Sequence, residues 1–151
     1  MKTEYPPLLS EGFEDIRLDQ LRPIFLDSFP SSTTRENILR KFKNWIQRVK
    51  KLNVKCEIWI DGSFATKKVN PRDIDIVVFI SSTDIRDFSA SKKRELEILT
   101  NERLTEEQKK ECLCDSYLVF ADDVYGRKYW EEKFGLIRDK QKPKGIFRIV
   151  I

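Results

Sequence analysis

The chain has 151 residues, of which 40% are hydrophobic, and a formal net charge of +4. These values exclude a disordered chain and predict one domain with a single hydrophobic core. Because the sequence contains no histidine, Ser-His-Asp hydrolysis, Cys-His proteolysis and histidine-ligated zinc are also excluded, which leaves acid–base or metal chemistry to carboxylates, lysines and tyrosines.

The N-terminal part of the chain is predicted to be an irregular arm over residues 1–33, followed by a long helix. Within the arm, only a short helix near residues 18–25 is expected, interrupted by Pro23. Thr33-Thr34-Arg35-Glu36 then fits a capping box, in which a hydroxyl and a glutamate satisfy backbone donors at a helix start. The helix that follows has one apolar face, formed by Ile38, Leu39, Phe42, Trp45, Ile46, Val49 and Leu52.

Two strands and the turn between them form the centre of the predicted fold. Residues 56–60 indicate a strand that ends in Asp61-Gly62-Ser63, where Asp61 is interpreted as a turn-former, and residues 64–69 indicate a turn or half-helix. Residues 73–80 are the clearest strand, because apolar side chains occupy both of its faces toward the far end, as in a central buried strand.

The C-terminal half alternates helices and strands. One or two helices are predicted over residues 85–112, the second capped by Thr105 with Gln108 three residues on. We predict a strand over 114–120, a helix over 125–134 capped by Gly135, and a last strand over 145–151. This order predicts one α/β (α+β) domain over residues 34–151, preceded by the arm at 1–33.

Two aspartates at the start of the central strand are the strongest indication of chemistry. Residues two apart on a strand point to the same face, so Asp73 and Asp75 lie side by side, about 6–7 Å apart at their Cα atoms. Two such anions repel each other, and the apolar strand solvates them poorly. A pair of magnesium ions would resolve the conflict, because magnesium prefers carboxylate and phosphate oxygens.

A phosphate-binding turn lies about ten residues upstream of this pair. Gly62 lets the backbone approach a phosphate closely, successive amide hydrogens can bind an anion, and Ser63 adds a hydroxyl donor. Lys67 could reach triphosphate oxygens, with a solvated surface lysine as the equal alternative. A phosphate grip beside a metal-binding pair is the equipment for magnesium-dependent attack on a nucleotide phosphate.

The order of these motifs closely resembles that of the polymerase-beta-type nucleotidyltransferase superfamily: an apolar strand, then Gly62-Ser63, then Asp73-Ile74-Asp75 at the start of a second apolar strand. A minimal bacterial branch is particularly similar, with the same Lys67 to Pro71 spacing and a tail like Pro143-Lys144-Gly145-Ile146. The resemblance covers most of the chain and implies a single nucleotidyltransferase-fold domain, with a small mixed central sheet flanked by helices.

The resemblance also implies how the site residues act. Asp73 and Asp75 would bridge two Mg2+ ions, with Mn2+ as an alternative, while Gly62 and Ser63 orient the β- and γ-phosphates. The family usually has a third carboxylate on a later strand, which completes the metal site and helps to deprotonate the attacking hydroxyl. Asp115 is the best candidate, and Asp122 and Asp123 are rivals that look more like a polar loop.

The expected reaction moves a nucleoside monophosphate from an NTP or dNTP to a hydroxyl acceptor and releases pyrophosphate. The resemblance implies a bacterial toxin–antitoxin or phage-defence setting, with a partner protein encoded nearby. Alternatives are an untemplated polymerase of short oligonucleotides, which could be primed on the protein's own tyrosine, and an inactive nucleotide- or partner-binding module.

Size and charge indicate the acceptor and the surroundings of the protein. The short N-terminal arm is not expected to form a small-molecule pocket of ~300–1,000 Å³, so a protein or nucleic-acid hydroxyl is the expected acceptor. Basic residues over 35–55, and Arg127, Lys128, Arg138 and Lys144, suit a polyanion, with ordinary surface charge as the alternative. No apolar run approaches the ~20 residues that span a bilayer. We expect a cytoplasmic protein with reduced thiols, in a homo-oligomer or hetero-complex and without membrane contact.

Overall fold

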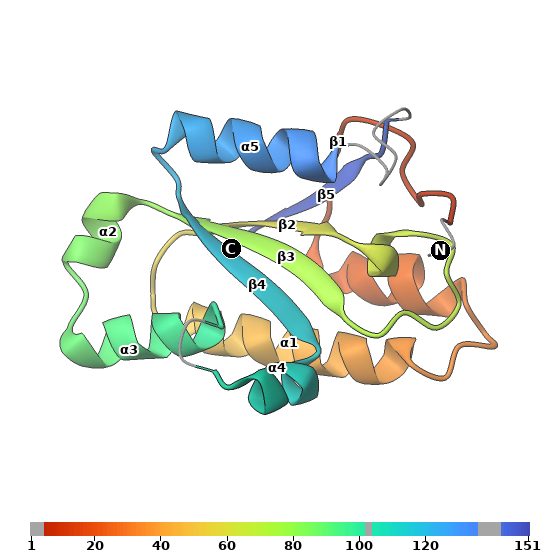
Figure 1. The fold of residues 1–151 in the computed structure, drawn as a ribbon, viewed down its shortest axis with the longest axis horizontal. Helices are drawn as coiled ribbons and strands as arrows, with labels where there is room; N and C mark the ends of the chain where they lie inside the picture. Colours follow the sequence, from red (N-terminus) through yellow and green to blue (C-terminus); the bar gives the residue numbers. More distant parts are fainter. Residues whose placement is uncertain (1–4, 102–103, 136–142) are drawn as a thin grey trace.

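A five-stranded mixed sheet forms the centre of the computed structural model, which describes residues 5–101, 104–135 and 143–151 (Figure 1). The strands lie in the order β1-β5-β2-β3-β4, with β1 parallel to β5, β3 parallel to β4, and β2 antiparallel to both β5 and β3. Their bounds are β1 Phe13–Asp15, β2 Glu57–Asp61, β3 Ile74–Ile80, β4 Cys114–Phe120 and β5 Ile146–Val150.

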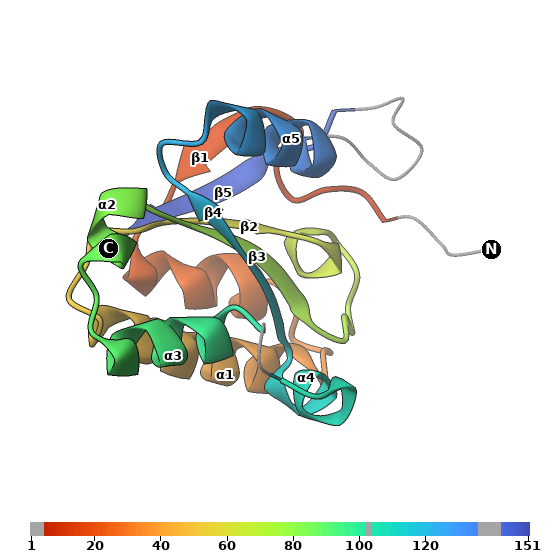
Figure 2. The ribbon, with the colours of Figure 1, turned by 60° about the vertical axis from the view of Figure 1, so that its left-hand side comes forward.

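Helices cover both faces of this sheet. The α-helices are α1 Arg35–Lys50, α2 Ser82–Arg86, α3 Ala90–Leu99, α4 Glu106–Cys112 and α5 Val124–Phe134. Short helical turns are η1 Leu18–Gln20, η2 Pro23–Asp27 and η3 Ser63–Ala65. Figures 1 and 2 show α1, α3 and α4 below the sheet and α5 above it. The predicted α+β class, with a mixed sheet flanked by helices, is therefore confirmed. Within the described ranges, no helix combines the length and the apolar composition needed to cross a membrane.

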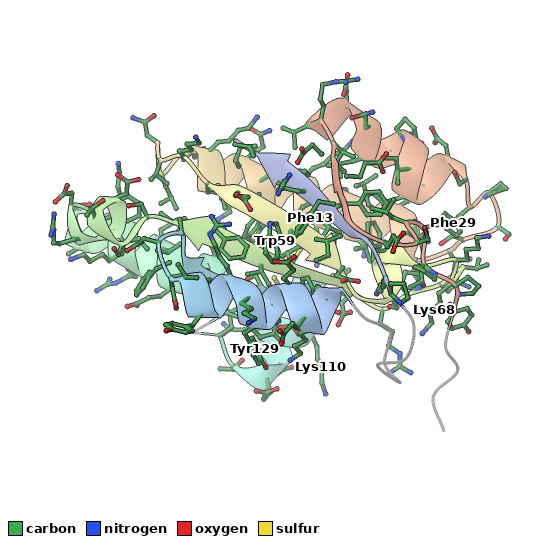
Figure 3. The ribbon with its side chains drawn as sticks, turned by 90° about the horizontal axis from the view of Figure 1, so that it is seen from above. Phe13, Phe29, Trp59, Lys68, Lys110 and Tyr129 are labelled. Carbon is green, nitrogen blue, oxygen red and sulfur yellow. The ribbon has the colours of Figure 1, made fainter. Side chains whose placement is uncertain are left out.

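The alternation of side chains along the strands divides the core between these two layers. On β3, Ile74, Ile76 and Val78 join the larger cluster, which contains the apolar face of α1. Val77 and Phe79 point the other way and pack with Trp59 and residues of α5. Figure 3 looks down on this second layer, where Trp59 lies beside Phe13, with ring centroids 5.0 Å apart.

The N-terminal segment is more ordered than the predicted arm. Its residues 13–15 form the edge strand β1, with Phe13 in register with Ile146. Leu21 and Phe25 are fully buried in the larger core. A three-residue strand is too short to show a period in the sequence, so the segment was expected to be irregular although it belongs to the same folded unit.

Two helix starts test the predicted capping boxes. The box at Thr105 and Gln108 is present, with reciprocal bonds of 3.1 and 2.9 Å. The box predicted over Thr33–Glu36 was wrong, because the helix is capped at Thr34, whose side chain makes no capping bond, and the Thr33 hydroxyl donates to Asn70 Oδ1. Instead, Ser32 Oγ accepts hydrogen bonds from the backbone N–H groups of Thr34 and Arg35. Several hydroxyl residues in a row made the sequence ambiguous here.

Candidate active site

Three aspartates lie in one row across adjacent strands. The register places Asp61 opposite Asp75 between β2 and β3, and Asp75 beside Asp115 between β3 and β4. Strand neighbours are about 4.8 Å apart, so the three positions share one end of the sheet. They lie on the face that α5 covers, as the next residue of that face on β3, Val77, shows. The structure thus brings the predicted third carboxylate beside the predicted pair.

Asp75 is the electrostatic centre of this row. The pKa of its carboxyl is raised to about 7, first by burial and then by the neighbouring charges of Asp73, Asp115 and Asp61, while Lys144 opposes the shift. Asp73, partly buried, lies directly before β3. The predicted mutual repulsion of the aspartates is therefore present.

Gly62 connects the turn after β2 to Asp75. Its φ of +78° lies in the left-handed region, which favours glycine. A Cβ built at this position would lie 2.8 Å from Asp75 Cγ and closer still to its Oδ2. Ser63 follows as the first residue of η3, and its side chain is partly exposed. The predicted phosphate-binding turn therefore packs directly against the predicted metal ligand.

Asp61 and Lys144 form a buried ion pair at the same turn. Asp61 is only 1% exposed, and its Oδ1 meets Lys144 Nζ and accepts from Gly62 N at 2.8 Å. Its Oδ2 has no hydrogen-bond partner among the described residues. Burial raises the pKa of Asp61 to about 7 although Lys144 opposes the shift. The turn-former interpretation of Asp61 was therefore incomplete, since Lys144 also donates to Gly62 O at 3.1 Å and fixes the turn from the far end of the chain.

Arg35 holds the chain that follows this turn, a role that the sequence did not indicate. Its side chain is fully buried and donates to the carbonyls of Phe25, Phe64, Thr66 and Lys68 at 2.7–3.2 Å. The guanidinium also lies 3.7 Å above the Phe29 ring. Burial lowers the pKa of Arg35 to about 10, so it stays charged at neutral pH. The prediction that Arg35 belongs to a basic surface was therefore wrong, because its side chain is buried.

Hydrogen-bond partners distinguish Asp115 from the two alternative candidates for the third carboxylate, Asp122 and Asp123. Tyr117 Oη donates to Asp115 Oδ2 at 2.9 Å, and Asn101 Nδ2 lies 3.5 Å from Oδ1. Burial and this hydrogen bond raise the pKa of Tyr117 above its usual range. Asp122 and Asp123 follow the opposite end of β4 and cap helices, through bonds to Ser82 and Gly126 respectively. They are the polar loop that the sequence suggested.

The other basic residues that were predicted to contact a polyanion differ in their surroundings. Lys67 is exposed, its backbone N–H donates to Pro6 O at 2.8 Å, and no contact joins its side chain to the carboxylates within the described part of the chain. Arg127 bonds Glu57 at 3.2 Å and Ala121 O at 2.7 Å, so it is a structural residue. Lys128 is exposed, and Arg138 lies outside the described residues. The helix α1 lies on the opposite face of the sheet from the aspartates (Figure 1), so its basic residues do not face the row.

Two cavities adjoin the N-terminal segment. One of about 510 Å³ lies beside Lys144 and is lined by Phe13, Lys128 and Glu131 among others. The second, of about 920 Å³, lies between Leu18, Lys50 and Ile149. The N-terminal residues thus line these spaces together with β5 and do not form a pocket of their own.

Carboxylate oxygens make this row suited to a hard divalent cation. Among the described residues, no group of three or more histidine, cysteine, aspartate or glutamate side chains converges closely enough to hold a metal. The chemistry of the donors nevertheless fits Mg2+ or Mn2+, which prefer carboxylate ligands. A cation would also relieve the repulsion that raises the pKa of Asp75. Asp73, Asp75 and Asp115 are the residues that would hold it.

Comparison with known proteins gives a family for nearly the whole chain. A family of unknown function (DUF6932) matches residues 2–150. No curated protein and no solved structure matched the chain. Since the match extends over almost every residue that builds the sheet and the aspartate row, the chain belongs to the DUF6932 family.

Proposed function

We propose that this protein is a magnesium-dependent nucleotidyltransferase, which moves a nucleoside monophosphate from an NTP or dNTP to a hydroxyl acceptor and releases pyrophosphate. The observation that carries the proposal is the common register of Asp75 and Asp115 beside the Gly62 turn. The turn proposed to bind phosphate lies at the same end of the sheet as these carboxylates, which supports the proposal.

The turn supplies the phosphate-binding groups. Gly62 presents backbone without a side chain, and Ser63 begins η3 with a partly exposed hydroxyl. Lys144 and Arg35 hold the two ends of this turn through backbone carbonyls. A turn fixed in this way loses little freedom when it binds a triphosphate, which favours catalysis by positioning.

The aspartates divide the remaining work. Asp73 and Asp75 would hold the magnesium ions, which when bound neutralise charge on the phosphates. Asp115 lies one strand further, where its carboxylate can accept the proton of an attacking hydroxyl. The acceptor hydroxyl therefore belongs on the β4 side of the row, and the triphosphate on the β2 side.

Thermal unfolding in the presence of nucleotides tests the binding half of the proposal. We expect Mg2+ and a triphosphate together to raise the melting temperature by about 5 to 10 °C at a hundredfold excess over Kd, since a ligand that binds only the folded state stabilises it by mass action. Each common NTP and dNTP is tested with Mg2+ and with EDTA.

Two variants serve as controls for that measurement. Asp73→Asn combined with Asp75→Asn removes the proposed ligands and should abolish the magnesium-dependent shift. Asp122→Asn changes a carboxylate at the opposite end of β4 and should keep it. If no triphosphate produced a shift, or if the double variant kept the full shift, the proposed site would be wrong.

A further inference from the structure

We infer that Tyr117 accepts a nucleotide from the active site of its own chain. The inference rests on the proposed nucleotidyltransferase activity and names an acceptor for it. Its basis is one observation: a tyrosine hydroxyl already occupies the place beside Asp115 where an acceptor hydroxyl belongs.

The position of the Tyr117 hydroxyl is defined by two contacts. Its Oη donates to Asp115 Oδ2 at 2.9 Å, within the range of a strong hydrogen bond to a carboxylate. Its ring packs against Trp130 of α5, with centroids 4.7 Å apart. Because Tyr117 follows Asp115 by two residues on β4, both side chains lie on the face of the sheet that α5 covers.

Tyr117 also remains accessible to solvent. It is 38% exposed, and β4 is the last strand of the sheet. A nucleotide could therefore be attached without breaking the core. If Tyr117 served only to fill space, its hydroxyl would not need to point at the carboxylate of Asp115.

The chemical step is a substitution at the α-phosphorus of the triphosphate. Tyr117 Oη forms a bond to this phosphorus, the bond from the phosphorus to the oxygen that bridges it to the β-phosphate breaks, and pyrophosphate leaves with the electron pair. The phenolic proton passes to Asp115 Oδ2, along the hydrogen bond already present. The product is a nucleoside monophosphate in phosphodiester linkage to tyrosine.

Tyr125 and Tyr129 provide matched comparisons on α5. They are 87% and 56% exposed, and thus more accessible than Tyr117. Figure 3 shows Tyr129 on the side of α5 away from Trp59. If exposure alone governed labelling, these two residues would be labelled first. If the hydrogen bond to Asp115 governs it, the label goes to Tyr117.

The experiment incubates the pure full-length chain with Mg2+ and each common triphosphate labelled with 32P at the α-phosphate. Intact-mass measurement gives the number of nucleotides per chain, and peptide mapping of the wild-type protein locates them. Tyr117→Phe, Tyr125→Phe and Tyr129→Phe are treated in the same way, and the melting temperature of each variant is measured with and without Mg2+ and nucleotide.

We expect one nucleoside monophosphate on Tyr117 of the wild type. Tyr117→Phe should lose the label and keep the nucleotide-dependent melting shift, whereas Tyr125→Phe and Tyr129→Phe keep both. When Tyr117→Phe is mixed with Asp75→Asn, the intact Tyr117 of the second chain should stay unlabelled, because the transfer occurs within one chain.

Different results would overturn the two proposals separately. A nucleotide-dependent melting shift without label on Tyr117, or with label on another residue, contradicts this inference and leaves the nucleotide site standing. Label on the Asp75→Asn chain in the mixture also contradicts transfer within one chain. Absence of both the melting shift and the label contradicts the proposed function together with the inference.

Discussion

Gly62 is the residue at which the turn after β2 packs directly against the carboxylate of Asp75. Gly62→Ala should reduce nucleotide transfer at least about 100-fold, the cost of a misplacement of about 1 Å in an active site. The added Cβ would displace Asp75. Activity and melting temperature measured together separate misplacement from unfolding.

Gly12 offers a control with a similar positive φ. Its φ is +76°, close to the +78° of Gly62, but a Cβ there would meet nothing within 4 Å. Gly12→Ala should therefore lower the free energy of unfolding by ~1–2 kcal/mol, the cost of a positive φ for a residue with a side chain, and leave nucleotide transfer unchanged. Equal loss of transfer in both variants would mean that strain, and not contact with Asp75, explains the glycine.

Asp75→Asn should abolish transfer and stabilise the metal-free protein. The folded pKa of about 7 lies above the ordinary aspartate value of 3.8, so the folded state binds this proton more tightly than the unfolded state. The resulting stability is present below pH ~4 and is lost as the pH rises through 7. Asparagine does not ionise, and the variant escapes this loss.

The gain of Asp75→Asn should consequently depend on pH. In EDTA we expect it to be about 2 to 4 kcal/mol at pH 8 and much smaller at pH 5. Urea unfolding at the two pH values measures the difference. A gain that is the same at both would show that repulsion within the row does not destabilise the folded protein.

Asp115→Asn should lower transfer by about 100-fold or more, because general base catalysis typically contributes 10²–10⁴-fold. Asp122→Asn and Asp123→Asn should leave transfer and stability nearly unchanged, because asparagine can accept the same backbone hydrogen bonds at the helix starts. Rates for the three variants rank the candidates. The reverse ranking would assign the third carboxylate to the loop after β4.

At this scale, the sequence indicated the residues whose motifs are local. Gly62, Ser63, Asp73 and Asp75 lie within one short segment, and Asp115 opens a recognisable strand. Lys144 could not be placed in this way, because its bond to Gly62 spans 82 positions in the sequence. Periodicity carries no information about such a contact.

Among the elements, α1 holds the turn through η3 by the buried side chain of Arg35. Arg35→Met would leave four backbone carbonyls without their donor, and we expect a loss of about 3 to 5 kcal/mol in the free energy of unfolding. Arg40→Met, on the exposed side of the same helix, should change stability by less than about 0.5 kcal/mol. Urea denaturation compares them, and similar losses would contradict the role of Arg35.

The long elements followed from the sequence more reliably than the short ones. The apolar face of α1 and the buried strand β3 each repeat their pattern over several turns or pairs, and β4 was predicted with its observed bounds. In contrast, β1 has three residues and α2 five. Such lengths show no period, and β1 exists because β5 provides a partner from the other end of the chain.

At the scale of the whole molecule, the sheet separates the acidic row from the basic helix α1. The row faces the side covered by α5, where Lys144 approaches it. The basic residues of α1 were expected to suit a polyanion, but this helix lies in the layer opposite α5 (Figure 2). The sequence gives the charge of this helix but not its position, because the topology of the sheet decides which layer α1 covers.

The fate of the two ends of the triphosphate tests the central claim most directly. The pure protein, alone or with candidate proteins and oligonucleotides, is incubated with Mg2+ and a triphosphate labelled at either the α- or the γ-phosphate. We predict that α-label joins a protein or nucleic acid, that γ-label is released as pyrophosphate, and that Asp75→Asn does neither. Transfer of γ-label, release of inorganic phosphate alone, or unchanged transfer in Asp75→Asn would contradict the assignment of this site as a nucleotidyltransferase.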